Sequence, residues 1–122
     1  MSTTTTTSTT SDADIAALRR QLKIKSGVTS RLKKEHELYQ KEAVDQKIKQ
    51  DKLIADGAEE WDIKNLGKMR DESEKMIQDS AGRFARAYGE LRDLIVSAKK
   101  EDALAQDEAF LKAEGILEEA AV

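Results

Sequence analysis

Helical spacing without a single proline is the feature that most limits how this chain can fold. From Ile15 onward, apolar residues recur at intervals of three and four, which places them on one face of an α-helix. Proline interrupts helices, and none occurs among the 122 residues. The pattern therefore predicts long, uninterrupted helices in one small domain.

Three helices are expected, preceded by a leader. Residues 1–11 form a Ser/Thr-rich tract of low hydrophobicity, which predicts disorder. The following bundle is expected to span residues 12–120, with helices at about 12–56, 62–98 and 102–119.

Residues near the helix ends indicate how each helix is closed. Ser11 can cap the start of the first helix, and Gly57 can adopt the left-handed conformation that closes its end. Asp62 is expected to cap the second helix, so that Trp61 precedes the cap and packs against Leu66. This interpretation gives the only tryptophan a structural role at a tight turn.

The apolar seams are uneven along the two long helices. The first is rich up to Leu32 and thin beyond about residue 43, and the second is richer from Phe84 onward. Polar residues stand at expected apolar positions of the first helix: Lys25, Glu35, Gln46 and Gln50. At 1.5 Å per residue, the helices are roughly 65, 55 and 25 Å long, so the third covers only the rich halves. The predicted fold class is all-α, an elongated antiparallel three-helix bundle of the spectrin-like kind with two long helices and a shorter third.

Apolar residues in the thin part of the bundle allow two interpretations. Val44, Ile48, Met69 and Met76 either flank a two-helix seam or offer exposed contacts to a partner. A free two-helix coiled-coil hairpin, acting as a structural interaction protein, is the alternative architecture.

Catalytic chemistry finds no support in the sequence. The chain has no cysteine, and the single histidine, His36, has no second histidine one helical turn away that would complete a zinc pair. His36 is expected on the solvated surface. The six glycines form no phosphate-binding cluster, and the carboxylates lack a predicted pocket in which their pKa values would diverge. We therefore predict no enzyme activity, no catalytic residue, no cofactor and no metal site.

Charge is distributed asymmetrically. The stretch from Arg19 to Lys34 contains seven basic residues and no acid, whereas Glu101 to Val122 contains seven acids and one lysine. These stretches either neutralise each other inside the bundle or leave a basic strip for an acidic partner. A formal net charge of −3 and the absence of a groove-reading motif argue against nucleic acid. No apolar run approaches the ~20 residues of a membrane span, and no secretory signal is evident.

Three stretches of the sequence carry a family pattern. They read LKIKSGVTSRLKKEHELYQKEA (22–43), ADGAEEWDIKNL (55–66) and RDESEKMIQDSAGRFARAYGELRDLI (70–95). Their order, spacing and Asp-Gly turn resemble the tubulin-binding cofactor A family over about residues 18–117. One position departs from the pattern, because Gln78 stands where family members commonly carry a helix-kinking proline.

The resemblance implies a cytoplasmic, cytoskeleton-associated folding cofactor. Such a protein captures quasi-native β-tubulin after chaperonin release, buffers it and feeds αβ-tubulin heterodimer assembly, without nucleotide or metal. β-Tubulin is the implied partner, with other tubulin cofactors as further partners and a monomer or weak homodimer as the expected state.

The basic strip and the family motifs together give the predicted partner-binding residues. They are Lys23, Lys25, Arg31, Lys33, Lys34, Tyr39, Lys41, Glu42, Asp62, Lys64, Glu72 and Ser73.

Overall fold

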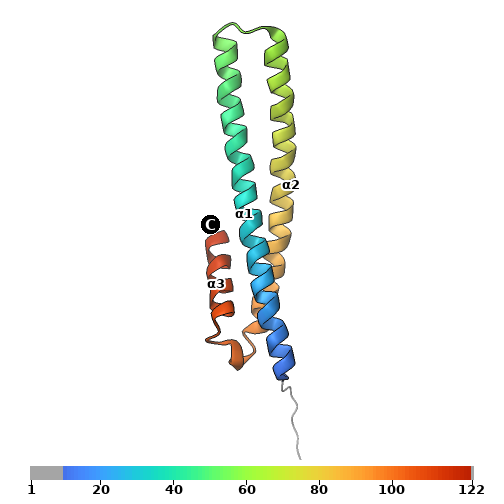
Figure 1. The fold of residues 1–122 in the computed structure, drawn as a ribbon, viewed down its shortest axis with the longest axis vertical. Helices are drawn as coiled ribbons and strands as arrows, with labels where there is room; N and C mark the ends of the chain where they lie inside the picture. Colours follow the sequence, from blue (N-terminus) through green and yellow to red (C-terminus); the bar gives the residue numbers. More distant parts are fainter. Residues whose placement is uncertain (1–9, 122) are drawn as a thin grey trace, which may run out of the picture. The chain divides into compact units, whose positions relative to one another are not determined.

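The computed structural model describes residues 10–121, and every regular element in that range is helical (Figure 1). In chain order the elements are α1 (Asp12–Ala55), α2 (Glu60–Ala98), the short 3-10 helix η2 (Asp102–Leu104) and α3 (Glu108–Ala120). The protein is an all-α helical bundle, which confirms the predicted fold class. The leader predicted at residues 1–11 lies outside the described residues except for its last two positions. None of the described helices is both long and apolar enough to cross a bilayer.

The chain divides into two compact units, each containing a part of both long helices. The three-helix unit comprises the residues up to Ser30 and those from Ala87 onward, and the hairpin unit comprises Arg31–Arg86. Both α1 and α2 continue without a break from one unit into the other. The same two helices are therefore held together by two separate sets of contacts.

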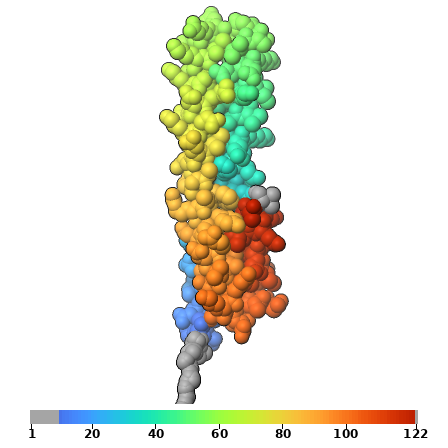
Figure 2. All heavy atoms as spheres, turned by 180° about the vertical axis from the view of Figure 1, so that it is seen from behind, coloured from blue at the N-terminus to red at the C-terminus, as the bar shows by residue number. Residues whose placement is uncertain are grey.

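An apolar core holds the three-helix unit together. Leu22 of α1, Leu91 of α2 and Leu104 of η2 are each 0% exposed, and Phe110 and Ala113 of α3 join the same cluster. Figure 2 shows α3, in red, packed against the orange C-terminal part of α2. Complete burial of one large apolar side chain stabilises a fold by about 1.5–3 kcal/mol. This core is therefore the main source of stability in the three-helix unit.

The third helix starts later than the sequence predicts. Residues 102–104 form the separate helix η2, and α3 begins only at Glu108. Between them, Asp107 takes an extended conformation (φ −69°, ψ 134°), and its side chain accepts a hydrogen bond from the Ala109 N–H at 2.9 Å. A carboxylate in this conformation satisfies a free N–H of the first helical turn, so it starts a new helix instead of continuing the old one. The break leaves Leu104 in the core.

The ends of α1 follow the sequence-based expectation. The Asp14 N–H donates to the Ser11 Oγ at 3.1 Å, which confirms the predicted cap. Gly57 adopts a φ of 73°, the left-handed conformation expected at the end of the helix. Both features depend on neighbouring residues only, which explains why local rules predicted them.

The predicted start of α2 is wrong. The helix begins at Glu60, and the carbonyl of Glu59 already accepts hydrogen bonds from the N–H groups of Asp62 and Ile63, at 3.0 and 3.2 Å. Asp62 thus lies within the first turn and does not cap it. Trp61 is also inside this turn and is 70% exposed, so the expected packing of its indole against Leu66 does not account for its position.

An ion pair ties the cap of α3 to α1. The Arg19 Nε donates to the Asp107 Oδ2 at 2.5 Å. This hydrogen bond, helped by those from the backbone N–H groups of Ala109 and Phe110, holds the pKa of the Asp107 carboxyl below its ordinary value of 3.8. Because folding lowers this pKa, the carboxylate stabilises the folded state above that ordinary value. The contribution is lost as the pH falls through the lowered pKa.

Replacing Asp107 with alanine tests this contribution. Loss of a helix cap lowers the free energy of unfolding by about 0.5–2 kcal/mol, and we expect a decrease of this size for Asp107→Ala at neutral pH. The difference from the natural protein should shrink as the pH falls well below 3.8, the ordinary carboxyl value. Urea unfolding across this pH range measures both effects, with the exposed Asp102→Ala as a matched control. A difference that stays constant down to about pH 2 would contradict the linkage.

Candidate partner-binding surface of the hairpin unit

The hairpin unit is held together with almost no apolar core. Within residues 31–86, all of which the structure describes, Leu32 is the one buried hydrophobic side chain, and it is 8% exposed. The other buried side chains of this range are Ser73 and Ser80. Several other apolar residues of this range are only half-buried: Ala43, Leu53, Leu66, Met76, Ile77 and Phe84. The contact between α1 and α2 must therefore depend on other interactions as well.

Polar side chains make four of the contacts between α1 and α2 here, and we call this set the polar seam. It joins Glu35 to Arg83, His36 to Ser80, Gln46 to Ser73, and Gln50 to Arg70. A typical intramolecular hydrogen bond contributes about 0.5–1.5 kcal/mol, and a partly exposed ion pair about 0–1 kcal/mol. The polar seam therefore stabilises the closed hairpin by only a few kcal/mol.

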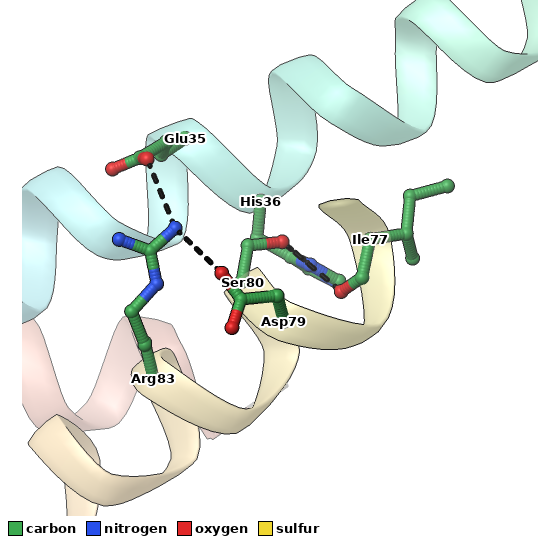
Figure 3. A network of polar contacts seen from close by, with 6 residues as sticks. All are labelled: Glu35, His36, Ile77, Asp79, Ser80 and Arg83. Atoms are coloured by element: carbon green, nitrogen blue, oxygen red, sulfur yellow. Dashed lines mark hydrogen bonds and ion pairs between the residues drawn. The ribbon is translucent and has the colours of Figure 1, made fainter. Parts of the chain in front are cut away.

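Figure 3 shows the first two contacts of the polar seam. Arg83 Nη2 lies 3.3 Å from Glu35 Oε1 of α1 and 3.3 Å from Asp79 Oδ2 of its own helix. The Nε atom of the same guanidinium is buried and has no hydrogen-bond partner. Arg83 thus joins the two helices while one of its donors remains unsatisfied.

His36 lies against α2 and not on the solvated surface, so that expectation is wrong. Its Nδ1 is 2.9 Å from the Ser80 Oγ (Figure 3). The Ser80 hydroxyl has one hydrogen, which it donates to the Ile77 carbonyl at 3.0 Å. While it donates to Ile77, its oxygen can accept from the His36 ring, and the tautomer of the ring decides these roles.

The remaining two contacts of the polar seam use glutamines. The Ser73 Oγ donates to the Gln46 Oε1 at 2.7 Å. The Gln50 amide accepts from Arg70 and donates to the Ile63 carbonyl at 3.4 Å. Gly67 makes room for this amide, because a Cβ at that position would lie 3.3 Å from the Gln50 Nε2. The polar breaks predicted in the seam of α1 thus meet polar partners on α2.

An open hollow of about 590 Å³ lies beside the Gln50 contact. Its lining mixes cationic, anionic and uncharged side chains: Gln50, Ile63, Lys64, Gly67, Lys68, Arg70, Asp71 and Glu74. No cluster of three or more possible metal ligands occurs among residues 10–121. What the hollow offers chemically is a set of hydrogen-bonding and charged groups of both signs.

Eight of the predicted partner-binding residues have exposed side chains. They are Lys23, Arg31, Lys34, Lys41, Glu42, Asp62, Lys64 and Glu72. Lys25, Lys33 and Tyr39 are half-buried, and Lys25 donates to Glu90 of α2 at 2.7 Å. Ser73 is buried in the polar seam, where it contacts α1. Lys23 and Lys25 belong to the three-helix unit, and the other ten residues belong to the hairpin unit.

Exposed apolar side chains add a feature that the predicted set lacks. Six large hydrophobic residues of the hairpin unit are more than half exposed: Leu38, Val44, Ile48, Ile54, Trp61 and Met69. The sequence allowed either flank packing or exposure for Val44, Ile48, Met69 and Met76. The first three are exposed, and only Met76 is half-buried. The sequence did not single out Leu38 and Ile54 as exposed apolar residues. Both lie off the predicted apolar seam, where residues of a helix are normally polar.

Internal pairing neutralises only part of the basic stretch. Arg19 pairs with Asp107, as the internal interpretation requires, and Lys25 pairs with Glu90 of α2. The exposed cations of this stretch are Arg20, Lys23, Arg31 and Lys34, and none of these four has an ion-pair partner within residues 10–121. Positive charge therefore remains exposed along this stretch.

These features define a class of protein: an all-α bundle whose hairpin exposes both charged and apolar side chains. Residues 17–117 match the family model described as tubulin binding cofactor A. The chain is 37% identical over 99 residues to the Gallus gallus protein named tubulin-specific chaperone A, covering 81% of this chain and 89% of that protein. The chain belongs to the tubulin-binding cofactor A family.

Solved structures agree with this assignment. The structure of human tubulin chaperone cofactor A shares 35% identity with this chain and superposes with a TM-score of 0.72, covering 86% of this chain and 99% of the human one. Tubulin folding cofactor A from Arabidopsis thaliana superposes with a TM-score of 0.80 and covers 87% of this chain and 97% of its own. At 24% identity, the plant protein supports the fold alone.

The two kinds of helix contact predict different local stabilities. We expect backbone amides of α1 and α2 within residues 31–86 to exchange with solvent faster than amides of the same helices in the three-helix unit. The reason is that a segment with few buried apolar contacts opens at a lower free energy. Hydrogen–deuterium exchange read by mass spectrometry measures this directly, and each continuous helix supplies its own control. Equal protection on both sides of Ser30 and Ala87 would contradict the expectation.

Proposed function

We propose that this protein is a tubulin-folding cofactor that captures quasi-native β-tubulin after chaperonin release. It buffers the bound polypeptide and feeds it into αβ-tubulin heterodimer assembly, in the cytoplasm and in association with the cytoskeleton. The single observation that carries the proposal is the family match over residues 17–117, which extends through both units. The protein acts by binding and without catalysis, and other tubulin cofactors are further partners.

The surface of the hairpin unit supports a binding role for the following reason. A partly folded client exposes apolar patches beside charged ones, and a complementary surface needs both kinds of side chain. The hairpin unit combines exposed apolar residues, such as Val44 and Ile48, with exposed lysines, such as Lys34 and Lys41. Tubulin is acidic, so these cations attract it over a distance set by the ionic strength.

We further propose that the exposed members of the predicted set contact the client directly. Ser73 contributes in another way, because its hydroxyl is used within the polar seam. The same holds for Lys25, whose ammonium pairs with Glu90.

Selective recovery of β-tubulin tests the proposed function. The tagged, full-length protein is incubated with cytosol, and bound α- and β-tubulin are quantified separately by mass spectrometry. We expect β-tubulin to exceed α-tubulin several-fold, because only β-tubulin is the client. The same resin without the protein controls for adsorption of intact heterodimers. Recovery of the two tubulins in equal amounts would contradict capture of free β-tubulin.

Charge reversal in the basic stretch tests electrostatic steering separately. We expect Lys23→Glu/Lys33→Glu/Lys34→Glu to slow association with β-tubulin by roughly tenfold at low salt, and by much less at high salt, because screening weakens long-range attraction. Stopped-flow association at several ionic strengths measures this. The control, Lys75→Glu/Lys100→Glu/Lys112→Glu, changes the formal net charge by the same amount at exposed positions outside the stretch. Unchanged association of the first variant at low salt would rule out steering but leave the family assignment intact.

A further inference from the structure

We infer that the turn between α1 and α2 is a docking surface for a cationic, arginine-rich segment of a second partner protein. We call this surface the hairpin tip and define it as residues 54–61, where the two long helices are joined (Figure 1). The indole of Trp61 stacks on a cationic side chain of that segment, and the carboxylates of the hairpin tip lie around the bound charge. This partner is distinct from β-tubulin, so the inference does not depend on the proposed function.

Two large apolar side chains are exposed at the hairpin tip. Ile54, in the last turn of α1, is 55% exposed, and Trp61, in the first turn of α2, is 70% exposed. Trp61 is the only tryptophan of the chain and the most exposed of the large hydrophobic residues that the structure describes. Aromatic side chains are enriched in protein–protein contacts, because covering them removes a large apolar area from water. An indole this exposed gains such burial only when a partner covers it.

Hydrogen bonds hold the backbone of the hairpin tip in place. The Gly57 N–H donates to the Ile54 carbonyl at 3.2 Å. The Ala58 N–H donates to the Leu53 carbonyl at 2.9 Å. With Gly57 in the left-handed conformation, these two bonds form the Schellman closure of α1. Because the first turn of α2 follows directly, the backbone that carries Trp61 is already ordered, which lowers the cost of binding.

Charge at the hairpin tip has one sign. Every charged residue between Lys52 and Lys64 is an acid. Asp56, Glu59 and Glu60 are exposed, and none of the three has an ion-pair partner among residues 10–121. The hairpin unit as a whole has no such excess, because residues 31–86 contain equal numbers of cations and anions. The negative charge is therefore a local property of the hairpin tip.

Helix stabilisation explains only part of this negative charge. Glu59 and Glu60 lie at the start of α2, where the helix dipole favours a carboxylate. Asp56 follows the last residue of α1, where the dipole disfavours one. A solvent-exposed acid at this unfavourable position, without an internal ion pair, indicates an interaction outside the chain.

An exposed indole beside unpaired carboxylates is suited to a cationic ligand. The face of a tryptophan attracts ammonium and guanidinium groups, and neighbouring carboxylates add complementary charge. Arginine satisfies both requirements, because its guanidinium stacks on aromatic rings and donates two parallel hydrogen bonds to a carboxylate. Tubulin is acidic and is repelled by the same carboxylates. The chemistry of the hairpin tip therefore favours a cationic partner over the client.

A second copy of this chain is a less suitable occupant. Its most cationic surface is the basic stretch, whose exposed members are Arg20, Lys23, Arg31 and Lys34. The hairpin tip and the basic stretch are different surfaces of one chain. A contact between them is heterologous, and unless the copies close into a ring it extends into an open chain. A separate partner that carries only the cationic segment avoids this outcome.

A cationic peptide tests the docking surface directly. The probe is a peptide in which Arg-Gly-Ser is repeated four times, and the matched peptide carries glutamate in place of arginine. Because Trp61 is the only tryptophan, its fluorescence reports on the hairpin tip alone. We expect the arginine peptide to change this emission in a saturable way at low salt, and the glutamate peptide to leave it unchanged.

Removing the negative charge of the hairpin tip should weaken this binding. We expect Asp56→Asn/Glu59→Gln/Glu60→Gln to lower the affinity for the arginine peptide at least tenfold, measured by the fluorescence anisotropy of a dye-labelled copy. Asp62 stays unchanged in this variant, because it belongs to the predicted client-binding residues. Circular dichroism checks that the variant remains helical.

The matched control neutralises three exposed acids outside the hairpin tip. It is Glu37→Gln/Asp45→Asn/Glu118→Gln, which changes the formal net charge by the same amount. We expect its affinity for the arginine peptide to stay within twofold of that of the natural protein. A separate variant, Trp61→Leu, keeps an apolar side chain but removes the aromatic face, and it should weaken binding at least threefold.

Several results would overturn the inference. If the natural protein binds both peptides alike, or neither, the hairpin tip is not selective for cations. If the tip variant and its control bind the arginine peptide equally, or Trp61→Leu binds as the natural protein does, the surface is assigned wrongly. If the natural protein sediments as an open chain of copies that the tip variant disperses, the occupant is a second copy.

Recovery of β-tubulin from cytosol separates this inference from the proposed function. We expect the tip variant to recover β-tubulin within twofold of the natural protein, because the client binds elsewhere. A loss of recovery that parallels the loss of peptide binding would assign the hairpin tip to the client and overturn the inference. If the natural protein recovers no β-tubulin but binds the arginine peptide through the hairpin tip, the proposed function fails and the inference stands.

Discussion

The pairing of α1 with α2 is the contact on which the rest of the structure depends, since each unit contains a segment of both helices. In the three-helix unit, this pairing is completed by α3 around Leu22, Leu91 and Leu104. In the hairpin unit it depends largely on side-chain hydrogen bonds, such as the one between Gln46 and Ser73. Apolar packing supplies stability but tolerates sliding, whereas a polar pair buried between helices is satisfied in one register only. The two units thus contribute different properties to the same pair of helices.

Most of the fold could be predicted from local patterns. Helical spacing of apolar residues without proline predicted three helices, and Ser11 and Gly57 marked the ends of α1 for reasons internal to their own turns. The start of α3 could not be predicted in this way, because the side chain of Asp107 is fixed partly by Arg19, 88 residues earlier in the chain. The prediction of where α2 starts was wrong for another reason. Several acids near Trp61 are suitable for a helix start, and backbone hydrogen bonding selects Glu59 among them.

The contacts of the candidate site were less predictable, because each one depends on which residue of the other helix lies opposite. The sequence indicated that Glu35, Gln46 and Gln50 interrupt an apolar seam, but a gap in a seam does not tell which residue on the other helix faces it. Without the register, His36 could be assigned only to the surface, although it lies 2.9 Å from Ser80. The basic stretch was predictable as a local excess of charge. Which of its cations are neutralised depended again on distant partners, Asp107 for Arg19 and Glu90 for Lys25.

The division into two units also explains how a chain this short can combine a stable core with a weakly packed segment. A protein whose stability is spread evenly over its length cannot weaken one segment without approaching global unfolding, because native domains are only marginally stable. Here the apolar core is concentrated in the three-helix unit, which leaves the hairpin unit free to carry polar contacts and exposed apolar side chains. Filling the polar seam with leucine would make a more stable hairpin, but one without the polar pairs that fix the register of α1 against α2. With its polar contacts kept, the hairpin unit remains the part of the described molecule with the fewest buried apolar side chains, and such a segment opens at a lower free energy than the rest.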